Sequence, residues 1–290
     1  MILSVGEILL DVYAKENSSS LDMNGKIGGA PFNVAANIAR NGGNVSFYGA
    51  IGKDGFGPFL AKEAEAYPFK TLLLDKTEYP TTLALVSLRN GERSFSFLRG
   101  ADFHLSSERL NDFSLNKGDI IHLGSLMLNE EEGARFFLKT RAFARKKGVY
   151  LSLDINIRPT LFENQNEARY VFEEVCSCVD FLKASEEDLE FLGMSPEELK
   201  NRYMKEKSIL FVSRSSKGSD VYIGNEHYSV SSKKIDILDS TGAGDAFYGR
   251  ILLELDQCSD PYALSAQKWK EILTKANEDG ANACLHQGAL

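Results

Sequence analysis

Short apolar runs alternate along the chain with longer segments in which apolar residues recur every three or four positions. The apolar runs predict buried strands at Ile2–Val5, Val45–Ala50, Thr71–Leu74, Ile120–Leu123, Val149–Leu153, Phe181–Lys183, Ile209–Ser213 and Val221–Ile223. The longer segments predict helices at Pro31–Asn41, Pro58–Ala66, Glu131–Lys147, Asn166–Cys178, Ser185–Leu192, Pro196–Glu206, Ala243–Leu255 and Trp269–Leu285. This alternation predicts an α/β fold with a mostly parallel sheet covered by helices on both faces.

Two stretches interrupt the alternation, at about residues 10–27 and 81–98. In the second, Asn90-Gly91 separates two strand-like runs, which is a strong signal of a β-hairpin. Phe95 and Phe97 alternate with serines, so one face of the hairpin is apolar and needs a cover. We expect a small β lid over the mouth of the α/β domain, and a homodimer if a partner's lid supplies part of that cover. A peripheral hairpin without such a role is the alternative.

The composition limits the classes of function. The 290 residues are 43% hydrophobic and 26% charged, which is normal for a globular protein of one large domain. The net charge of −8 opposes binding to nucleic acid, which needs a basic surface. No apolar run approaches the ~20 residues needed to cross a bilayer, so we expect no membrane partner. The four cysteines form no C-x-x-C pair and the first residues do not resemble a signal peptide, which predicts a cytoplasmic protein without a zinc site.

The most informative polar segment is Asp239-Ser240-Thr241-Gly242-Ala243-Gly244-Asp245, which opens a helical pattern. Its small residues let backbone N–H groups approach an anion, and the following helix adds the partial positive charge of its N-terminus. The carboxylate of Asp245 lies in the same turn. Amides that hold a phosphate beside a proton-accepting carboxylate are what phosphoryl transfer to a hydroxyl requires. An ordinary capped helix start, with Asp239 or Ser240 as the cap, is the alternative.

A second glycine-rich segment, Gly28-Gly29-Ala30-Pro31-Phe32-Asn33, precedes a helix of small residues. Together with Asp239–Gly249, it resembles the two signatures of the ribokinase/PfkB family of carbohydrate kinases, in the family's order. The resemblance implies one ribokinase-like α/β domain over residues 1–290, with three layers, a mostly parallel central sheet and the β lid. It also implies an ATP-dependent sugar kinase.

The same resemblance assigns residues to the chemistry and to the sugar. Asp245 would take the proton, and the amides of Gly242, Ala243 and Gly244 would stabilise the charge that develops on the phosphoryl group. The sugar would be bound by Asp11, Gly28, Gly29, Asn33, Arg99, Asp102, Asn156 and Arg158. Asp11 as a plain strand-end aspartate and Arg158 in a structural salt bridge are the alternatives.

For ATP, the resemblance points to residues spread over the second half of the chain, namely Lys183, Ser213, Ser215, Gly218 and Asn277. Ser215 replaces the middle glycine of the family's nucleotide loop, which predicts a tighter pocket for the ribose.

The resemblance also implies metal ions. Asp188 stands where the family has a glutamate that organises Mg²⁺ through water, and the adjacent Glu187 is a substitute for it. A capping box formed by Ser185 and Asp188 is the alternative. We further expect a monovalent cation, K⁺, beside Asp239 and Thr241.

The segment from Arg99 to Asp102 is similar to the fructokinase branch of the family. The resemblance therefore implies the conversion of D-fructose and ATP to fructose 6-phosphate and ADP. A ribokinase or a 2-keto-3-deoxygluconate kinase is the alternative within the family. A non-catalytic protein that senses a sugar or a nucleotide on this fold is the alternative from another class, although such a protein would be expected to have lost Asp245.

Overall fold

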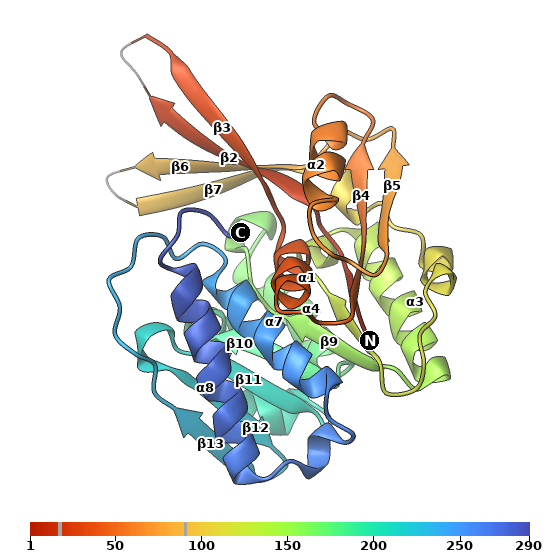
Figure 1. Ribbon diagram of the computed structural model, residues 1–290, viewed down its shortest axis with the longest axis vertical. Helices are drawn as coiled ribbons and strands as arrows, with labels where there is room; N and C mark the ends of the chain where they lie inside the picture. The colour runs from red at the N-terminus through yellow and green to blue at the C-terminus, as the bar shows by residue number, and fades with distance from the viewer. Residues whose placement is uncertain (17–18, 90–91) are drawn as a thin grey trace.

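The computed structural model describes residues 1–16, 19–89 and 92–290, and Figure 1 shows a large sheet in the body of the molecule with a second, smaller sheet projecting from one end. Within these residues, nine strands form the large sheet in the order β13-β12-β11-β10-β9-β8-β1-β4-β5. Neighbouring strands run parallel, except that β12 is antiparallel to β11 and to β13. The predicted α/β class with a mostly parallel sheet is confirmed.

The strands of the large sheet are β1 (Ile2–Val5), β4 (Val45–Gly52), β5 (Leu72–Thr77), β8 (Ile120–Leu123), β9 (Tyr150–Asp154), β10 (Phe181–Ser185), β11 (Ile209–Ser213), β12 (Ser219–Ile223) and β13 (Glu226–Val230). The helices are α1 (Ala30–Arg40), α2 (Gly57–Ala64), α3 (Glu131–Lys147), α4 (Gln165–Cys176), α5 (Glu186–Leu192), α6 (Pro196–Glu198), α7 (Ala243–Asp256) and α8 (Ala266–Ala283).

Most predicted elements are confirmed with ends shifted by a few residues. The exception among the helices is the segment predicted as Pro196–Glu206, where α6 is one short turn followed by a π-helical turn at Leu199–Tyr203. Strand β13 was not predicted, because its residues are largely exposed and only partly apolar. It is the edge strand beyond β12, where one side of the strand needs no partner.

Side chains of successive strand residues enter two separate cores, one on each face of the large sheet. In β1, Ile2 packs with α1, α7 and α8, while Leu3 and Val5 pack on the opposite side with α3, α4 and α5. This follows from the alternation of side chains along a strand. The result is the expected arrangement of three layers, with the sheet between two layers of helices.

The second sheet joins the two stretches that interrupt the helical alternation. Its strands are β2 (Leu9–Glu16), β3 (Leu21–Gly28), β6 (Leu83–Arg89) and β7 (Glu92–Leu98), in the order β3-β2-β6-β7. The small separate sheet is therefore confirmed, and its role as a lid stays a prediction. The expected turn at Asn90-Gly91 and the side chain of Phe95 lie outside the described residues.

The two faces of this second sheet differ. Asp11, Ala84 and Phe97 are opposite one another on neighbouring strands and face a pocket above the large sheet. On the other face, the outermost side chains are apolar and more than half exposed: Leu21, Met23 and Leu98.

The order of the strands also places the functional site. The chain runs from β1 outward to β4 and β5, and then returns to the other side of β1 to form β8. Ligands in open α/β sheets bind at such a reversal, outside the carboxyl ends of the strands. The second sheet lies over this position in Figure 1.

Within the described part of the chain, no helix combines the length and the apolar character needed to cross a membrane.

Candidate active site

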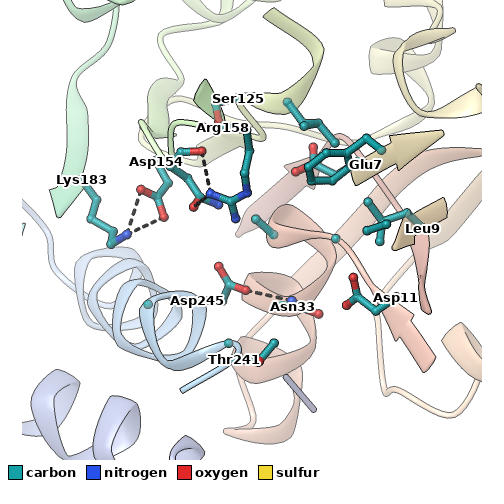
Figure 2. A pocket seen from close by; sticks show the side chains of 18 of the residues that line it. Glu7, Leu9, Asp11, Asn33, Ser125, Asp154, Arg158, Lys183, Thr241 and Asp245 are labelled. Carbon is teal, nitrogen blue, oxygen red and sulfur yellow. Dashed lines mark hydrogen bonds and ion pairs between the residues drawn. The ribbon is translucent and has the colours of Figure 1, made fainter. Parts of the chain in front are cut away.

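A pocket of about 310 Å³ lies where the carboxyl ends of the central strands face the second sheet (Figure 2). Its walls bring together ten residues that the sequence assigned to catalysis, sugar, nucleotide or cation: Asp11, Gly29, Asn33, Asn156, Arg158, Lys183, Thr241, Gly242, Gly244 and Asp245. A concave site with a few convergent polar groups is the usual form of a small-molecule site, and this volume is at the small end of the usual range.

Asp245 and Asn33 meet at the floor of the pocket. Gly242 adopts a left-handed φ of 78° and starts α7, so Asp245 lies in the first turn of that helix. Asn33 lies in the first turn of α1, and its Nδ2 donates a hydrogen bond of 2.8 Å to Asp245 Oδ2. Burial raises the pKa of Asp245 to about 7, while the hydrogen bond from Asn33 acts in the opposite direction. The carboxyl group can therefore both hold and release a proton near neutral pH.

Two glycines allow close approaches at one end of the pocket, Gly28 of β3 to Asp11 of β2 and Gly29, before α1, to the segment after β1. A Cβ on Gly28 would lie 2.1 Å from Asp11 Oδ2, and a Cβ on Gly29 would lie 2.3 Å from the carbonyl oxygen of Glu7. Gly29 also has a φ of 113°, which side chains disfavour. Gly28 does not line the pocket itself, but its lack of a side chain makes room for Asp11. Burial raises the pKa of Asp11 to about 6, and nearby Arg158 opposes that shift.

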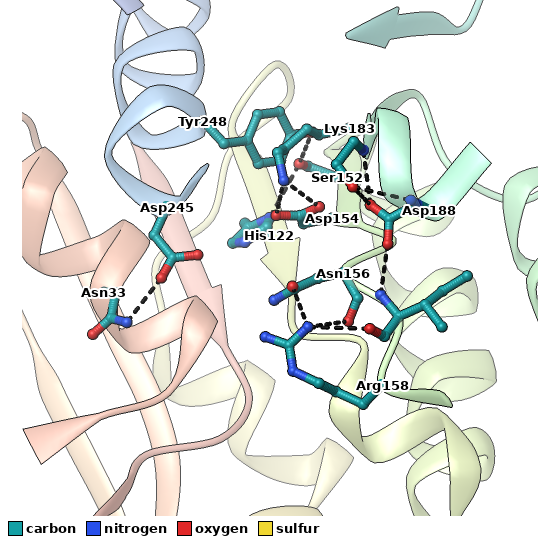
Figure 3. Close-up of polar contacts among 12 residues, drawn as sticks. Asn33, His122, Ser152, Asp154, Asn156, Arg158, Lys183, Asp188, Asp245 and Tyr248 are labelled. Carbon is teal, nitrogen blue, oxygen red and sulfur yellow. Dashed lines mark hydrogen bonds and ion pairs between the residues drawn. The ribbon is translucent and has the colours of Figure 1, made fainter. Parts of the chain in front are cut away.

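Lys183 and Asp154 form a buried ion pair on the opposite wall (Figure 3). Lys183 Nζ lies 2.9 and 2.8 Å from the two carboxylate oxygens of Asp154. Burial lowers the pKa of Lys183, but the facing carboxylates of Asp154 and Asp188 outweigh burial and raise it, so the amine stays charged. A Cβ on Gly244 would lie only 3.3 Å from Lys183 Nζ, which places this positive charge beside the first turn of α7.

A series of hydrogen bonds among buried polar side chains lies next to this wall. Tyr248 from α7 shares a 2.7 Å hydrogen bond with Ser152, and Ser152 contacts His122 Nδ1 at 3.2 Å. Burial lowers the pKa of His122 to about 3, so the imidazole is neutral and serves as a hydrogen-bonding group.

The loop after β9 carries Asn156 and Arg158. Asn156 has a φ of 38°, and its Oδ1 accepts a 2.6 Å hydrogen bond from Arg158 Nη1. The same nitrogen also donates to the carbonyl oxygens of Asn156 and Ile157. These contacts fold the arginine back over its own loop and fix the guanidinium at the pocket wall (Figure 3).

Asp188 holds this loop to α5. Its Oδ1 accepts a bond of 2.8 Å from the amide of Ile157, and its Oδ2 accepts bonds from the amide and the hydroxyl of Ser185. The capping box at Ser185 and Asp188 is therefore present. Glu187 is exposed, and neither acid lines the pocket. No group of three His, Cys, Asp or Glu side chains suited to a metal ion occurs among the described residues.

Arg99 and Asp102 pair with each other outside the pocket lining. The Arg99 guanidinium contacts both carboxylate oxygens of Asp102 and donates to Asn129, and Asp102 is fully buried beside Thr82. The sequence placed both residues at the sugar or its lid. They form an ion pair directly after β7, a strand of the second sheet, and their role toward a sugar or a lid stays a prediction.

The predicted nucleotide residues other than Lys183 form a second group at the carboxyl end of β11. Ser215 has a φ of 49°, the left-handed conformation that the family's glycine would adopt without strain. Gly218 leaves room for the carbonyl oxygen of Val230, which a Cβ would approach to 2.0 Å. Asn277 from α8 donates to that same carbonyl. Ser213 ends β11 at this loop, and none of these residues lines the main pocket.

The loop before α7 is held by its own hydrogen bonds. Asp239 Oδ1 accepts bonds from the amide and the hydroxyl of Thr241, and its Oδ2 accepts a 3.1 Å bond from the amide of Gly288. A Cβ on Gly242 would lie 2.6 Å from the Cα of Ala289. The segment around Gly288 therefore packs directly behind the loop that carries the predicted amides. Ala243, the remaining predicted amide residue, lies between Gly242 and Gly244 but not in the pocket lining.

Two charged residues of the pocket were missed by the sequence analysis as site residues. Glu7 follows β1 and lines the pocket, and Asp154 ends β9 and pairs with Lys183. Both are charged residues directly after or at the end of an apolar run, which is the signal that could have found them.

Comparison with known proteins identifies relatives of the whole chain. The model of the pfkB family of carbohydrate kinases matches residues 1–290. Fructokinase-1 of Oryza sativa subsp. japonica is 33% identical, with 100% of this chain and 93% of the rice protein covered. The probable fructokinase-2 of Arabidopsis thaliana is 32% identical, with 100% and 92% covered.

Comparison with solved structures also finds fructokinases that are similar over nearly the whole chain. Fructokinase from Vibrio cholerae O395, bound to fructose, ADP and a calcium ion, has a TM-score of 0.87 at 28% identity, covering 99% of this chain and 94% of that one. Fructokinase from Xylella fastidiosa with bound ATP also has a TM-score of 0.87, at 30% identity, covering 99% and 93%.

Proposed function

The chain belongs to the pfkB family of carbohydrate kinases, and on that basis we propose that it is a fructokinase, which converts D-fructose and ATP to fructose 6-phosphate and ADP. The relatives that cover its full length are fructokinases, and structures of two similar enzymes contain fructose and ADP, or ATP. The observation that carries the proposal is the buried Asp245 carboxyl group, which faces the pocket beside glycine amides and the charged Lys183.

In this reaction the sugar hydroxyl oxygen forms a bond to the γ-phosphorus of ATP, and the bond from that phosphorus to the β,γ-bridging oxygen breaks. Asp245 takes the hydroxyl proton, for which a pKa of about 7 is well suited. The amides of Gly242, Ala243 and Gly244, at the N-terminus of α7, stabilise the charge on the transferred group. ADP leaves with the electron pair of the broken bond.

For the sugar, we propose that Asp11, Asn33, Asn156 and Arg158 bind its hydroxyls, while Gly28 and Gly29 leave the room that a close approach requires. These side chains lie within one pocket of about 310 Å³. Arg99 and Asp102 act indirectly, by fixing the end of β7 beside the pocket.

For the nucleotide, we propose that Lys183 contacts the phosphates, and that Ser213, Ser215, Gly218 and Asn277 form the adenosine end. The positive charge of Lys183 next to Gly244 supports the first part. Mg²⁺ would be held mainly by the phosphates and water, as is usual for this ion, and it would neutralise phosphate charge. Asp188 and Glu187 do not form a protein cage for it, since Asp188 is engaged in the capping box. A K⁺ ion beside Asp239 and Thr241 stays a prediction.

The second sheet is proposed to act as a lid that excludes water during transfer. Phe97 faces the pocket, so the face left for a partner is the opposite one, which exposes Leu21, Met23 and Leu98. We propose a homodimer through that face. A cytoplasmic location is proposed on the basis of the composition.

The test is a coupled ADP-release assay with MgATP and a panel of acceptors: fructose, ribose, 2-keto-3-deoxygluconate and adenosine. We expect fructose to exceed ribose and adenosine in kcat/KM by at least about tenfold, because a site built to bond particular hydroxyls rejects analogues that leave its groups unpaired. A preference for another acceptor would exclude fructokinase while leaving the kinase chemistry intact.

A further inference from the structure

Glu7 is a pocket residue that the proposed mechanism does not use. It follows β1 at the point where the order of the strands reverses, and its carboxyl group lies against Gly124. A Cβ on Gly124 would lie 2.2 Å from Glu7 Oε2, so only glycine leaves room for the carboxyl group there. Glu7 is 4% exposed, yet it lines the same pocket as Asp11 and Arg158 (Figure 2).

The carboxyl group of Glu7 accepts a hydrogen bond from its own backbone amide, but one of its oxygens is left over. Its Oε2 is buried and has no hydrogen-bond partner among the described residues. Nearly all buried polar atoms in native proteins are bonded, so an unpartnered oxygen in a pocket wall suggests a ligand. By contrast, buried Asp154, on another wall of the pocket, and buried Asp188, outside the pocket lining, have both carboxylate oxygens occupied by neighbours.

The charged groups around Glu7 come from two parts of the chain. Arg99 and Asp102 follow β7, and Arg158 follows β9. Burial raises the pKa of Glu7 to about 8, and Asp102 adds to the rise, while the hydrogen bond from the backbone amide of Glu7 and the charges of Arg99 and Arg158 lower it. At neutral pH the group is therefore mostly a neutral carboxylic acid, which has an O–H donor.

We propose that Glu7 determines sugar specificity through a hydrogen bond from its unpartnered carboxyl group to an oxygen atom of the bound acceptor. The inference rests on the proposed function and concerns the same pocket. It gives Glu7 and Asp11 complementary roles, one as a donor and the other, when ionised, as an acceptor. A neutral Glu7 also adds no negative charge to a pocket that already contains Asp11, Asp154 and Asp245 and must admit the phosphates of ATP.

The test compares wild type with Glu7→Gln, which keeps the shape and a donor, and with Glu7→Leu, which removes both donor and acceptor. Values of kcat and of KM for fructose are measured at saturating MgATP from pH 6 to 9. For wild type we expect the KM to rise above about pH 8, as Glu7 loses its proton. Glu7→Gln should keep a KM within about threefold of wild type at pH 7 and should lack that rise. Glu7→Leu should raise the KM by about tenfold, with kcat changed less than about twofold.

The exposed Glu108, replaced by Gln, is the matched control and should behave as wild type. If Glu7→Leu does not fold, the pH profile of Glu7→Gln decides alone. A wild-type KM in Glu7→Leu, or the same alkaline rise in Glu7→Gln, would overturn the inference. If wild type turns over another acceptor but not fructose, the proposed function fails instead, and the same three variants are compared with that acceptor.

Discussion

Asn33 Nδ2 and Asp245 Oδ2 are 2.8 Å apart, although the two residues are separated by 212 positions in the chain. This hydrogen bond joins the first turns of α1 and α7, the two helices that follow the glycine-rich segments. It also favours the ionised form of Asp245 against the effect of burial. The two signatures therefore form one chemical unit, in which the first adjusts the proton affinity of the second.

The replacement Asp245→Asn should lower kcat by about 10²–10⁴, because it removes the general base while keeping the shape of the side chain. Sugar binding, measured by calorimetry, should change little. Asp236→Asn, an exposed change in the preceding loop, is the control. Retention of more than about a tenth of wild-type kcat would show that Asp245 is not the base.

The pH dependence of kcat should report the same group. Because the base must be ionised, kcat should fall as the pH drops through about 7, the pKa of Asp245. In Asn33→Ala the hydrogen bond that favours ionisation is lost, so this acid limb should move to higher pH by about one unit. Stopped assays from pH 5 to 9 measure both profiles, and an unmoved limb would contradict the assignment.

Replacing Asp188 by alanine should destabilise the protein, since the amides of Ile157 and Ser185 would lose their acceptor. We expect a loss of about 1–3 kcal/mol in the free energy of unfolding. Glu187→Ala is the matched control, because its exposed side chain should change stability by less than about 0.5 kcal/mol. Should Glu187→Ala instead raise the KM for MgATP at unchanged stability, Glu187 and not Asp188 would be the residue that acts on the metal.

Variants of the ion pair between Lys183 and Asp154 can separate the contribution of Lys183 to stability from its contribution to activity. Lys183→Met leaves the Asp154 charge buried and should cost about 3–5 kcal/mol in the free energy of unfolding. Adding Asp154→Leu should restore much of that loss, since no unpaired charge remains. Activity should stay low in both variants if Lys183 contacts phosphate. Recovery of kcat in the double variant would limit Lys183 to a structural role.

The dimer is tested at the outer face of the second sheet. Met23→Glu should shift sedimentation from dimer to monomer, because it places a charge among Leu21 and Leu98. Leu138→Glu, on a similarly exposed leucine of α3, is the control and should leave the profile unchanged. A wild-type protein that already sediments as a monomer would exclude this interface.

The sequence predicted the helices and strands well where their side chains are buried on one face or on both faces. The strands ending at Val5, Leu123 and Ser213 were recovered to the residue, because each is a short run of buried apolar side chains. The segment after Pro196 failed, because its helical period continues through Leu199–Tyr203 while the backbone changes to a π turn. Periodicity does not report that local change.

For the site, the sequence identified the residues on glycine-rich turns and missed what depends on burial. Glu7 follows an apolar run, but its burial and its unpartnered oxygen are tertiary properties that the run does not reveal. The pairing of Arg99 with Asp102 is likewise a tertiary contact that spacing does not reveal. The sequence left the role of Asp188 open between a metal site and a capping box. In the fold, its carboxylate accepts a hydrogen bond from the amide of Ile157 and so holds the loop after β9 to α5.

The position of β1 between β4 and β8 has a consequence for synthesis on the ribosome. This first strand can pair with β4 early, but its other edge has no partner until Ile120–Leu123 emerge, and an open sheet edge invites pairing with other chains. Asp245 emerges much later still. The nascent chain therefore has an unpaired edge on β1 until β8 is made, and it lacks the carboxylate of Asp245 for longer still. A translation product that stops just before Asp245 would contain most of the large sheet and no proposed general base.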